Sequence, residues 1–341
     1  MAVNELEHRY SRQVLFTPIG TKGQQKLAQA SVAVVGCGAT GSALLGLLAR
    51  SGVGRLVIVD RDYVEASNLQ RQSLFDERDA ADSVPKAIAA ARKLATFNSV
   101  IEVEPQVADL TPANAQRLLS GADLLLDGTD NFETRYLIND FAVSTSTPWI
   151  YAAAVGSYAA TMNIIPGETA CLACLFPEAP RGMVETCETA GILNSAVNLV
   201  ASIAASEALK LLVGARSSLR PTLLAWDVWN NQHSEVSAAA PVSDCRCCRR
   251  KEFVHLAGTG RPHITLCGRN SVQIHERERS IDFSELSVRL KPHGQVRHNQ
   301  FVLKFWQGSY EMTLFPDGRA IFAGTTDTAV ARSLYARYVG S

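Results

Sequence analysis

Residues 31–60 read SVAVVGCGATGSALLGLLARSGVGRLVIVD, and this stretch decides the fold. A β-branched run over 31–36 ends in glycine, helical spacing follows over 40–51, and a second buried strand pattern covers 55–60. Strand, glycine-rich turn, helix and strand in this order are typical of the first unit of a doubly wound, nucleotide-binding sheet.

Strand and helix patterns keep alternating up to residue 155. Strand patterns cover 101–107, 122–127 and 149–155, and helical patterns cover 86–97, 112–119 and 131–144. Beyond Gly156, residues 158–165 and 223–236 read as longer, partly alternating strands with an Ala-rich helix between them. We therefore expect an α/β fold: a Rossmann-like, doubly wound, mostly parallel sheet that continues into antiparallel strands.

The C-terminal part of the chain follows a different pattern. The break AAAP at 238–241 precedes a cysteine cluster, and a small α+β module is expected after residue 253. Its expected elements are strands at 264–266 and 272–275, a helix at 283–290, a hairpin at 301–315 with its turn at 316–318, and a helix at 329–338. We predict two domains, residues 1–250 and residues 251–341.

Composition narrows the class of partner. The 341 residues are 47% hydrophobic, and 33 basic side chains balance 33 acidic ones, which favours neither nucleic acid nor a membrane surface. The apolar stretch 192–213 contains Asn194, Glu207 and Lys210, so it reads as a buried helix. Residues 1–13 are polar where a secretory signal would be apolar, and we expect a cytoplasmic protein.

The turn 36–41, GCGATG, is a G-x-G-x-x-G motif between a strand and a helix. Glycine permits the tight turn, and the N–H groups at the helix start face a phosphate. Asp60 ends the next strand, where it can accept hydrogen bonds from a ribose. This motif alone fits a dinucleotide equally well, so an NAD-dependent oxidoreductase is one alternative.

Several cations, one before the glycine turn and two after it in sequence, change this interpretation. Arg12, Arg71 and Lys86 have no purpose at a nicotinamide site, whereas they suit the charge that develops when a triphosphate is cleaved. Asp130, in the strand-ending sequence DGTDN, can hold Mg²⁺ against phosphate oxygens or cap the next helix.

Five motifs together resemble those of the ThiF/MoeB/HesA family, bacterial relatives of ubiquitin-activating enzymes. They are RYSRQ at 9–13, GCGATG, VDRDYVEASNLQRQ, VPK and DGTDN, and they run in order over roughly 5–250. The resemblance is to ThiF-type proteins with a C-terminal extension. It implies an ATP–Mg²⁺ site and a homodimer in which Arg12 reaches the partner's site. The implied nucleotide contacts are Gly36, Gly38, Ala39, Thr40, Gly41, Asp60, Asp62, Asn68, Arg71, Gln72, Lys86, Asp130 and Asn131.

The activity that this resemblance implies is ATP-dependent adenylylation of a protein carboxylate. The substrate is the C-terminal glycine of a ubiquitin-like sulfur carrier of the ThiS/MoaD type, which a persulfide donor then converts to a thiocarboxylate. Thiamin, molybdenum-cofactor and tRNA-thiolation pathways all remain open. A relative that activates a small carboxylate on tRNA is a second alternative, and a scaffold that merely binds nucleotide is a third.

Two C-x-x-C pairs are candidate metal ligands. Cys171 and Cys174 form the first pair, and Cys245 and Cys248 the second. Four thiolates complete a closed tetrahedral Zn²⁺ site, and the family resemblance places zinc pairs here. Each pair alone could instead be redox-active or simply buried, and Cys247 is an alternative ligand.

Cys187 stands apart from both pairs, in the sequence TCETAG. It resembles the family's loop cysteine, which is linked to acyl or persulfide intermediates, and we predict a covalent catalytic role. A nucleophilic thiol needs a lowered pKa, which Glu185 and Glu188 would oppose.

Overall fold

The computed structural model describes residues 8–178, 190–258, 264–267, 271–274 and 280–340. The chain divides into two compact units, residues 1–259 and residues 260–341, and each is described by itself.

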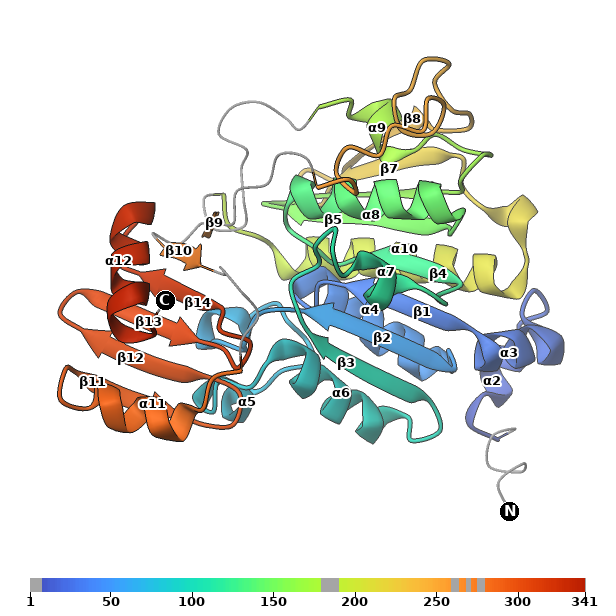
Figure 1. Ribbon diagram of the computed structural model, residues 1–341. Helices are drawn as coiled ribbons and strands as arrows, with labels where there is room; N and C mark the ends of the chain where they lie inside the picture. The colour runs from blue at the N-terminus through green and yellow to red at the C-terminus, as the bar shows by residue number, and fades with distance from the viewer. Residues whose placement is uncertain (1–7, 179–189, 259–263, 268–270, 275–279, 341) are drawn as a thin grey trace. The chain divides into compact units, whose positions relative to one another are not determined.

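An eight-stranded sheet organises the first unit (Figure 1). Its strand order is β3-β2-β1-β4-β5-β6-β7-β8, parallel from β3 to β5 and antiparallel from β5 to β8. The strands are β1 (Ser31–Val35), β2 (Arg55–Asp60), β3 (Glu102–Val107), β4 (Leu124–Asp127), β5 (Trp149–Val155), β6 (Tyr158–Ile164), β7 (Thr222–Asp227) and β8 (Gln232–Ser237). The expected fold class is confirmed.

Helices cover both faces of this sheet, and every residue of β1 and β4 is therefore buried. On one face, Val35 and Leu125 pack with Leu118 of α7 (Ala115–Leu119) and Phe141 of α8 (Phe132–Thr145). Figure 1 shows α4 (Ala39–Ser51) and α10 (Asn194–Val213) on the other face, and these two helices contact each other. The helix α6 (Lys86–Phe97) packs on β2 and β3.

The helix α10 is the one described helix whose length and apolar composition would also suit a membrane span. It packs on β5, β6 and α4, and its Glu207 is buried against Lys210 and Asn163. A helix that packs on a sheet can be as long and as apolar as a membrane span, and the contacts of α10 agree with such a packed helix.

Two expected elements of this unit are wrong in their bounds. The stretch 223–236 is a hairpin and not one strand, because the Asp227 carboxylate accepts the main-chain N–H groups of Trp229 and Asn230, and Asn231 adopts φ +54°. The helix expected over 112–119 is only α7, because the Asn114 side chain caps the Thr111 N–H and holds the preceding residues in a turn.

Short helices also occur that the sequence patterns did not indicate. They are α2 (Ser11–Val14), α3 (Gly20–Gln29), α5 (Glu77–Ala81), α9 (Leu172–Leu175) and two 3-10 turns, η1 (Ala66–Asn68) and η2 (Arg216–Ser218).

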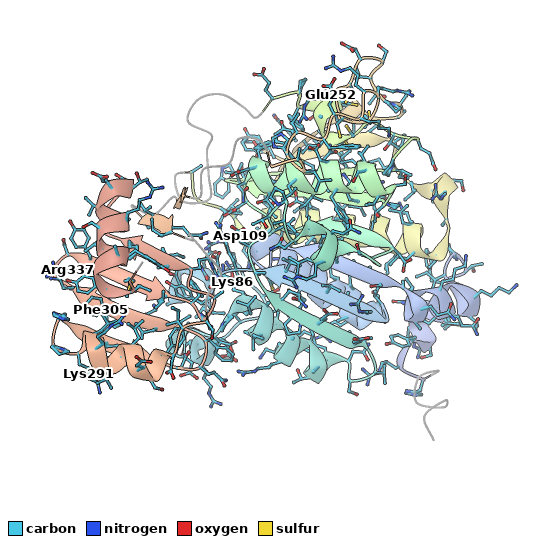
Figure 2. The ribbon with its side chains drawn as sticks, viewed as in Figure 1. Lys86, Asp109, Glu252, Lys291, Phe305 and Arg337 are labelled. Carbon is cyan, nitrogen blue, oxygen red and sulfur yellow. The ribbon has the colours of Figure 1, made fainter. Side chains whose placement is uncertain are left out.

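The second unit is a six-stranded antiparallel sheet with two helices. Its strand order is β11-β12-β13-β14-β10-β9. The elements are β9 (Ile264–Cys267), β10 (Ser271–Ile274), α11 (Phe283–Leu290), β11 (Gln295–His298), β12 (Leu303–Gln307), β13 (Tyr310–Leu314), β14 (Ala320–Ala323) and α12 (Thr328–Tyr338). Phe305, labelled in Figure 2, packs against Tyr338 of α12 with ring centroids 4.9 Å apart.

The expected hairpin in this unit exists, but its turn is elsewhere. β12 and β13 are joined at Gly308, which adopts φ +61°. The turn at 316–318 joins β13 to β14, a strand that the sequence analysis did not predict.

Candidate functional site

The glycine turn after β1 lies in backbone contact with the turn after β4. A Cβ on Gly41 would lie 1.9 Å from the Gly36 carbonyl oxygen, and one on Gly128 would lie 2.3 Å from the same atom. Gly36 itself adopts φ +88°. Gly38, in contrast, leaves open space, since the nearest atom to its Cβ would be the Gly128 oxygen at 4.0 Å. The turn is therefore closed on its β4 side and open at Gly38.

Asp60 is buried behind this turn, at the end of β2. One carboxylate oxygen accepts the Cys37 N–H at 2.5 Å and the other accepts the Asp62 N–H at 2.7 Å. Burial raises the pKa of Asp60, against the opposing effect of the Lys86 charge. The carboxylate thus holds the glycine turn and the start of the next loop together, and each oxygen keeps a second lone pair for a ligand.

Lys86, labelled in Figure 2, begins α6 and lies beside the carboxylate of Asp62. Its Nζ lies 3.3 Å from an Asp62 oxygen, and its side chain is only 9% exposed. Burial alone would lower the pKa of Lys86, but Asp62, Asp60 and Asp130 together raise it. Lys86 is therefore a fixed positive charge that interacts with three carboxylates, two at the end of β2 and one after β4.

The segment after β2 supplies further polar groups. Asn68 is buried, and its Oδ1 accepts the Glu65 N–H at 3.1 Å, which fixes the η1 turn. Gln72 is also buried, yet its Oε1 has no hydrogen-bond partner among the described residues. Arg71 donates to the Ser67 carbonyl at 2.9 Å and is only partly exposed. A buried amide oxygen without a partner costs free energy, so Gln72 fits a site whose ligand supplies a donor.

The structure shows which of the neighbours Asp130 and Asn131 caps α8. Asn131 caps α8, because its Oδ1 accepts the Thr134 N–H at 2.9 Å. Asp130 is exposed, and its contact with the Asn131 side chain is long, at 3.4 Å. The cap is therefore Asn131, and the Asp130 carboxylate is available to a ligand.

Sequence reasoning missed a buried ion pair under this turn. Arg135 Nε lies 2.8 Å from the Asp127 carboxylate, and both side chains are at most 7% exposed. The only signal was the position of an arginine one turn into the helix after DGTDN, which is also where many surface arginines occur.

Arg12 is not brought to the glycine turn of its own chain. It lies in α2, where the neighbouring Gln13 donates to the Ser51 carbonyl at the C-terminal end of α4. The glycine turn lies at the other end of α4, and 13 helical residues span roughly 20 Å. The segment that carries Arg12 and the glycine turn therefore lie at opposite ends of α4.

The two C-x-x-C pairs meet at a second site. The Sγ atoms of Cys171, Cys174, Cys245 and Cys248 all lie within 4.8 Å of one another, so they could hold a metal ion. Hydrogen bonding to Cys171 and burial raise the pKa of Cys174 to about 12. Thiols that are difficult to ionise without a cation are suited to a metal, whose charge reverses this cost.

Cys247 is not in this group of four. Its buried sulfur accepts a hydrogen bond from Asn139 Nδ2 at 3.2 Å, while Asn139 Oδ1 accepts the Leu172 N–H at 2.9 Å. Asn139 of α8 therefore links both cysteine-bearing segments. Cys187 lies outside the described residues, and the side chain of Cys267 is not described.

A glycine turn open to a phosphate, a buried lysine among carboxylates and a four-cysteine cluster define a nucleotide-binding α/β protein with a candidate metal centre. The family model described as ThiF family matches residues 10–247, and this chain belongs to the ThiF family.

Similar proteins extend this comparison. The sulfur carrier protein ThiS adenylyltransferase of Bacillus subtilis is 44% identical over 336 residues, 97% of this chain and 99% of that protein. The sulfur carrier protein adenylyltransferase of Thermus thermophilus is 40% identical over 64% of this chain and 82% of its own. The adenylyltransferase and sulfurtransferase MOCS3 of Sus scrofa is 36% identical over 72% of this chain and 54% of its own.

A solved structure of E. coli MccB with ATP superimposes with a TM-score of 0.62. It is 23% identical, and the match covers 70% of this chain and 74% of MccB. At this identity the similarity shows the fold alone.

Proposed function

We propose that this protein adenylylates the C-terminal glycine carboxylate of a ubiquitin-like sulfur carrier protein, using ATP. Two relatives that match most of their length to this chain are named sulfur carrier adenylyltransferases. The observation that carries the proposal is the position of Lys86, a buried cation beside the glycine turn that interacts with Asp62 and Asp130.

The triphosphate of ATP would lie against the open side of the glycine turn. The N–H groups of Ala39 and Thr40 begin α4, where the helix dipole favours an anion. Asp60 would accept from the ribose, and the unpartnered Gln72 oxygen would accept from a donor of the nucleotide. Arg71 and Lys86 would stabilise negative charge on the departing pyrophosphate.

Asp130 is the proposed ligand for Mg²⁺. Its carboxylate is exposed at the end of β4, the edge of a doubly wound sheet where ligands bind. When bound, Mg²⁺ would neutralise phosphate charge. The carrier's carboxylate attacks the α-phosphorus in line, so the task of the protein is alignment and charge stabilisation.

We propose Zn²⁺ as the metal of the cysteine cluster. A tetrahedral site with Zn–S bonds of 2.3 Å spaces its sulfurs about 3.8 Å apart. The sulfur pairs Cys171–Cys174, Cys171–Cys245 and Cys174–Cys248 lie 3.8, 3.6 and 3.5 Å apart. Because four sulfurs leave no position for a substrate, the ion would be structural. The four cysteines form no disulfide, which fits a reducing compartment such as the cytoplasm.

We also propose a homodimer. Leu15 and Phe16, which follow Arg12 closely, are 70% and 61% exposed, and Leu47 is an exposed apolar residue of α4. Exposed apolar side chains of this size favour a protein partner. Arg12 lies far from the glycine turn of its own chain. In a twofold dimer through this region, it could reach the nucleotide of the partner instead.

The later sulfur-transfer steps belong to the same proposal. The terminal sulfur of a persulfide donor would attack the acyl-adenylate and displace AMP, which leaves an acyl disulfide. The Cys187 thiol would then attack the donor's sulfur in that disulfide, which releases the thiocarboxylate and leaves a disulfide between Cys187 and the donor for an external thiol to reduce.

The experiment that tests this function is carrier-dependent exchange of labelled pyrophosphate into ATP. We expect exchange only with Mg²⁺ and a ThiS/MoaD-type carrier, and none with the same carrier lacking its terminal glycine. ATP binding with zinc retained but no exchange with any such carrier would overturn the proposal, and exchange stimulated by tRNA would favour the tRNA-directed alternative.

A further inference from the structure

Arg135 forms two directional hydrogen bonds beneath the turn that carries Asp130. Its Nε donates to the Asp127 carboxylate at 2.8 Å, and its Nη2 donates to the Thr129 carbonyl at 2.7 Å. Arg135 is 5% exposed and Asp127 is fully buried. The guanidinium therefore ties the last residue of β4 to the residue that directly precedes Asp130.

Asp127 completes this network from its other oxygen. That oxygen accepts the Thr129 N–H at 2.8 Å and the Thr129 hydroxyl at 2.7 Å. Thr129 is thus held at its amide, its hydroxyl and its carbonyl, and all three bonds lead to Asp127 or Arg135. With these groups fixed, the direction in which the chain presents the Asp130 side chain is largely determined.

Aromatic rings hold the guanidinium in place. The Arg135 Cζ lies 5.2 Å from the Tyr151 ring centroid and 5.4 Å from that of Phe132. Arg135 also interacts electrostatically with Asp130, although the Asp127 charge acts on it more strongly. A planar group with fixed donors suits this geometry, and a lysine ammonium cannot reproduce both bonds with the same angles.

We infer that Arg135 is a positioning residue that orients the Asp130 carboxylate toward the metal-bound triphosphate, acting through Asp127 and Thr129. This inference rests on the proposed adenylylation. It adds a residue to the site that contacts neither the nucleotide nor the carrier, and it assigns the network a function beyond stability.

The test uses the full-length protein and two readouts. The first is hydrogen–deuterium exchange of the peptide that contains the Thr129 amide, measured without any ligand. The second is the Mg²⁺ concentration that gives half-maximal pyrophosphate exchange. Arg135→Lys keeps the charge and removes the fixed geometry, and Thr129→Val removes only the hydroxyl bond to Asp127. Glu207→Gln disturbs a buried ion pair of α10 and serves as the matched control.

We expect Arg135→Lys to expose the Thr129 amide to exchange and to raise the half-maximal Mg²⁺ concentration at least about tenfold, as loss of an outer-shell partner does at metal sites. Thr129→Val should shift both readouts in the same direction by less, and it carries the test if Arg135→Lys does not fold. Glu207→Gln should move neither readout.

An unchanged Mg²⁺ requirement in folded Arg135→Lys, or equal shifts in Glu207→Gln, would overturn the inference. If the wild-type protein shows no carrier-dependent exchange, the proposed function fails instead. Amide exchange then still decides the inference, because unchanged protection of Thr129 in Arg135→Lys would overturn it.

Discussion

The side chain of Lys86 lies 3.3 Å from the carboxylate of Asp62, and the main-chain N–H of Lys86 donates to the Asp62 carbonyl at 2.8 Å. Two contacts between the same residues fix the start of α6 against the loop that follows β2. The ammonium group is thereby held beside the glycine turn before any ligand binds. Such preorganisation is what electrostatic stabilisation of a transition state requires.

Replacing this lysine should abolish most activity. We expect Lys86→Met to lower carrier-dependent pyrophosphate exchange by about a hundredfold, the typical cost of removing one preorganised charge contact. The matched control is Lys93→Met, since Lys93 lies on the same helix but is 37% exposed and pairs with Asp76. Equal losses in both variants would show that the position of Lys86 has no special importance.

Gly41 should tolerate no side chain. In Gly41→Ala the new Cβ would lie 1.9 Å from the Gly36 oxygen, so the backbone must shift, and we expect a loss of about 3 kcal/mol in the free energy of unfolding. Gly46→Ala is the control on the same helix, because its Cβ would make only an ordinary 3.9 Å contact with Leu74. That variant should be neutral or stabilised by up to about 1 kcal/mol. Urea unfolding measures both, and a stable Gly41→Ala would contradict the close approach.

The register of the metal ligands can be tested with two neighbouring cysteines. Cys248→Ser should lose bound zinc, because the Cys248 sulfur lies 3.5 Å from that of Cys174 within the cluster. Cys247→Ser should retain zinc, since Cys247 lies outside the four and serine can still accept from Asn139. Elemental analysis after dialysis against a chelator gives the metal content. Zinc lost from Cys247→Ser alone would reverse the assignment.

Subunit mixing tests whether Arg12 acts on the partner's site. Arg12→Ala and Lys86→Met homodimers should each be nearly inactive. After denaturation and refolding together in equal amounts, half of the dimers would contain one intact site, so about a quarter of wild-type exchange should return. The physical reason is that the segment with Arg12 and the glycine turn lie at opposite ends of α4 within one chain. No recovery in mixed dimers, with their formation verified, would place Arg12 outside the active site.

Glu207 should make stability depend on acid pH. Burial alone would raise its pKa, but hydrogen bonds from Lys210, the Arg220 N–H and Asn163 outweigh this and lower the pKa below 4.5. Its stabilisation is therefore present above pH 4.5 and is lost as the pH falls through the lowered pKa. We expect Glu207→Gln to cost about 2 kcal/mol at neutral pH, and less in acid. Urea unfolding at both pH values checks this, and a pH-independent difference would contradict it.

The sequence determined the class of fold and the kind of site. Buried strand runs, helical spacing and the glycine turn are local patterns. Strands that alternate with helices in this way favour one architecture, a mostly parallel sheet with helices on both faces. The C-x-x-C spacing likewise fixes two thiols close together, whatever the rest of the chain does. These features were predicted correctly because neighbouring residues determine them.

Tertiary structure alone decided which residues meet. It made Asn131 the cap and left Asp130 free, buried Arg135 against Asp127, and excluded Cys247 from the four sulfurs. It also showed that 223–236 forms a hairpin, and that the segment with Arg12 lies at the C-terminal end of α4. The cap, the ion pair and the hairpin are contacts within one segment, but residue type alone did not show which of several neighbouring polar groups makes each bond. The positions of Cys247 and Arg12 depend on packing between segments distant in sequence, and side-chain type and spacing along one segment do not encode such distances.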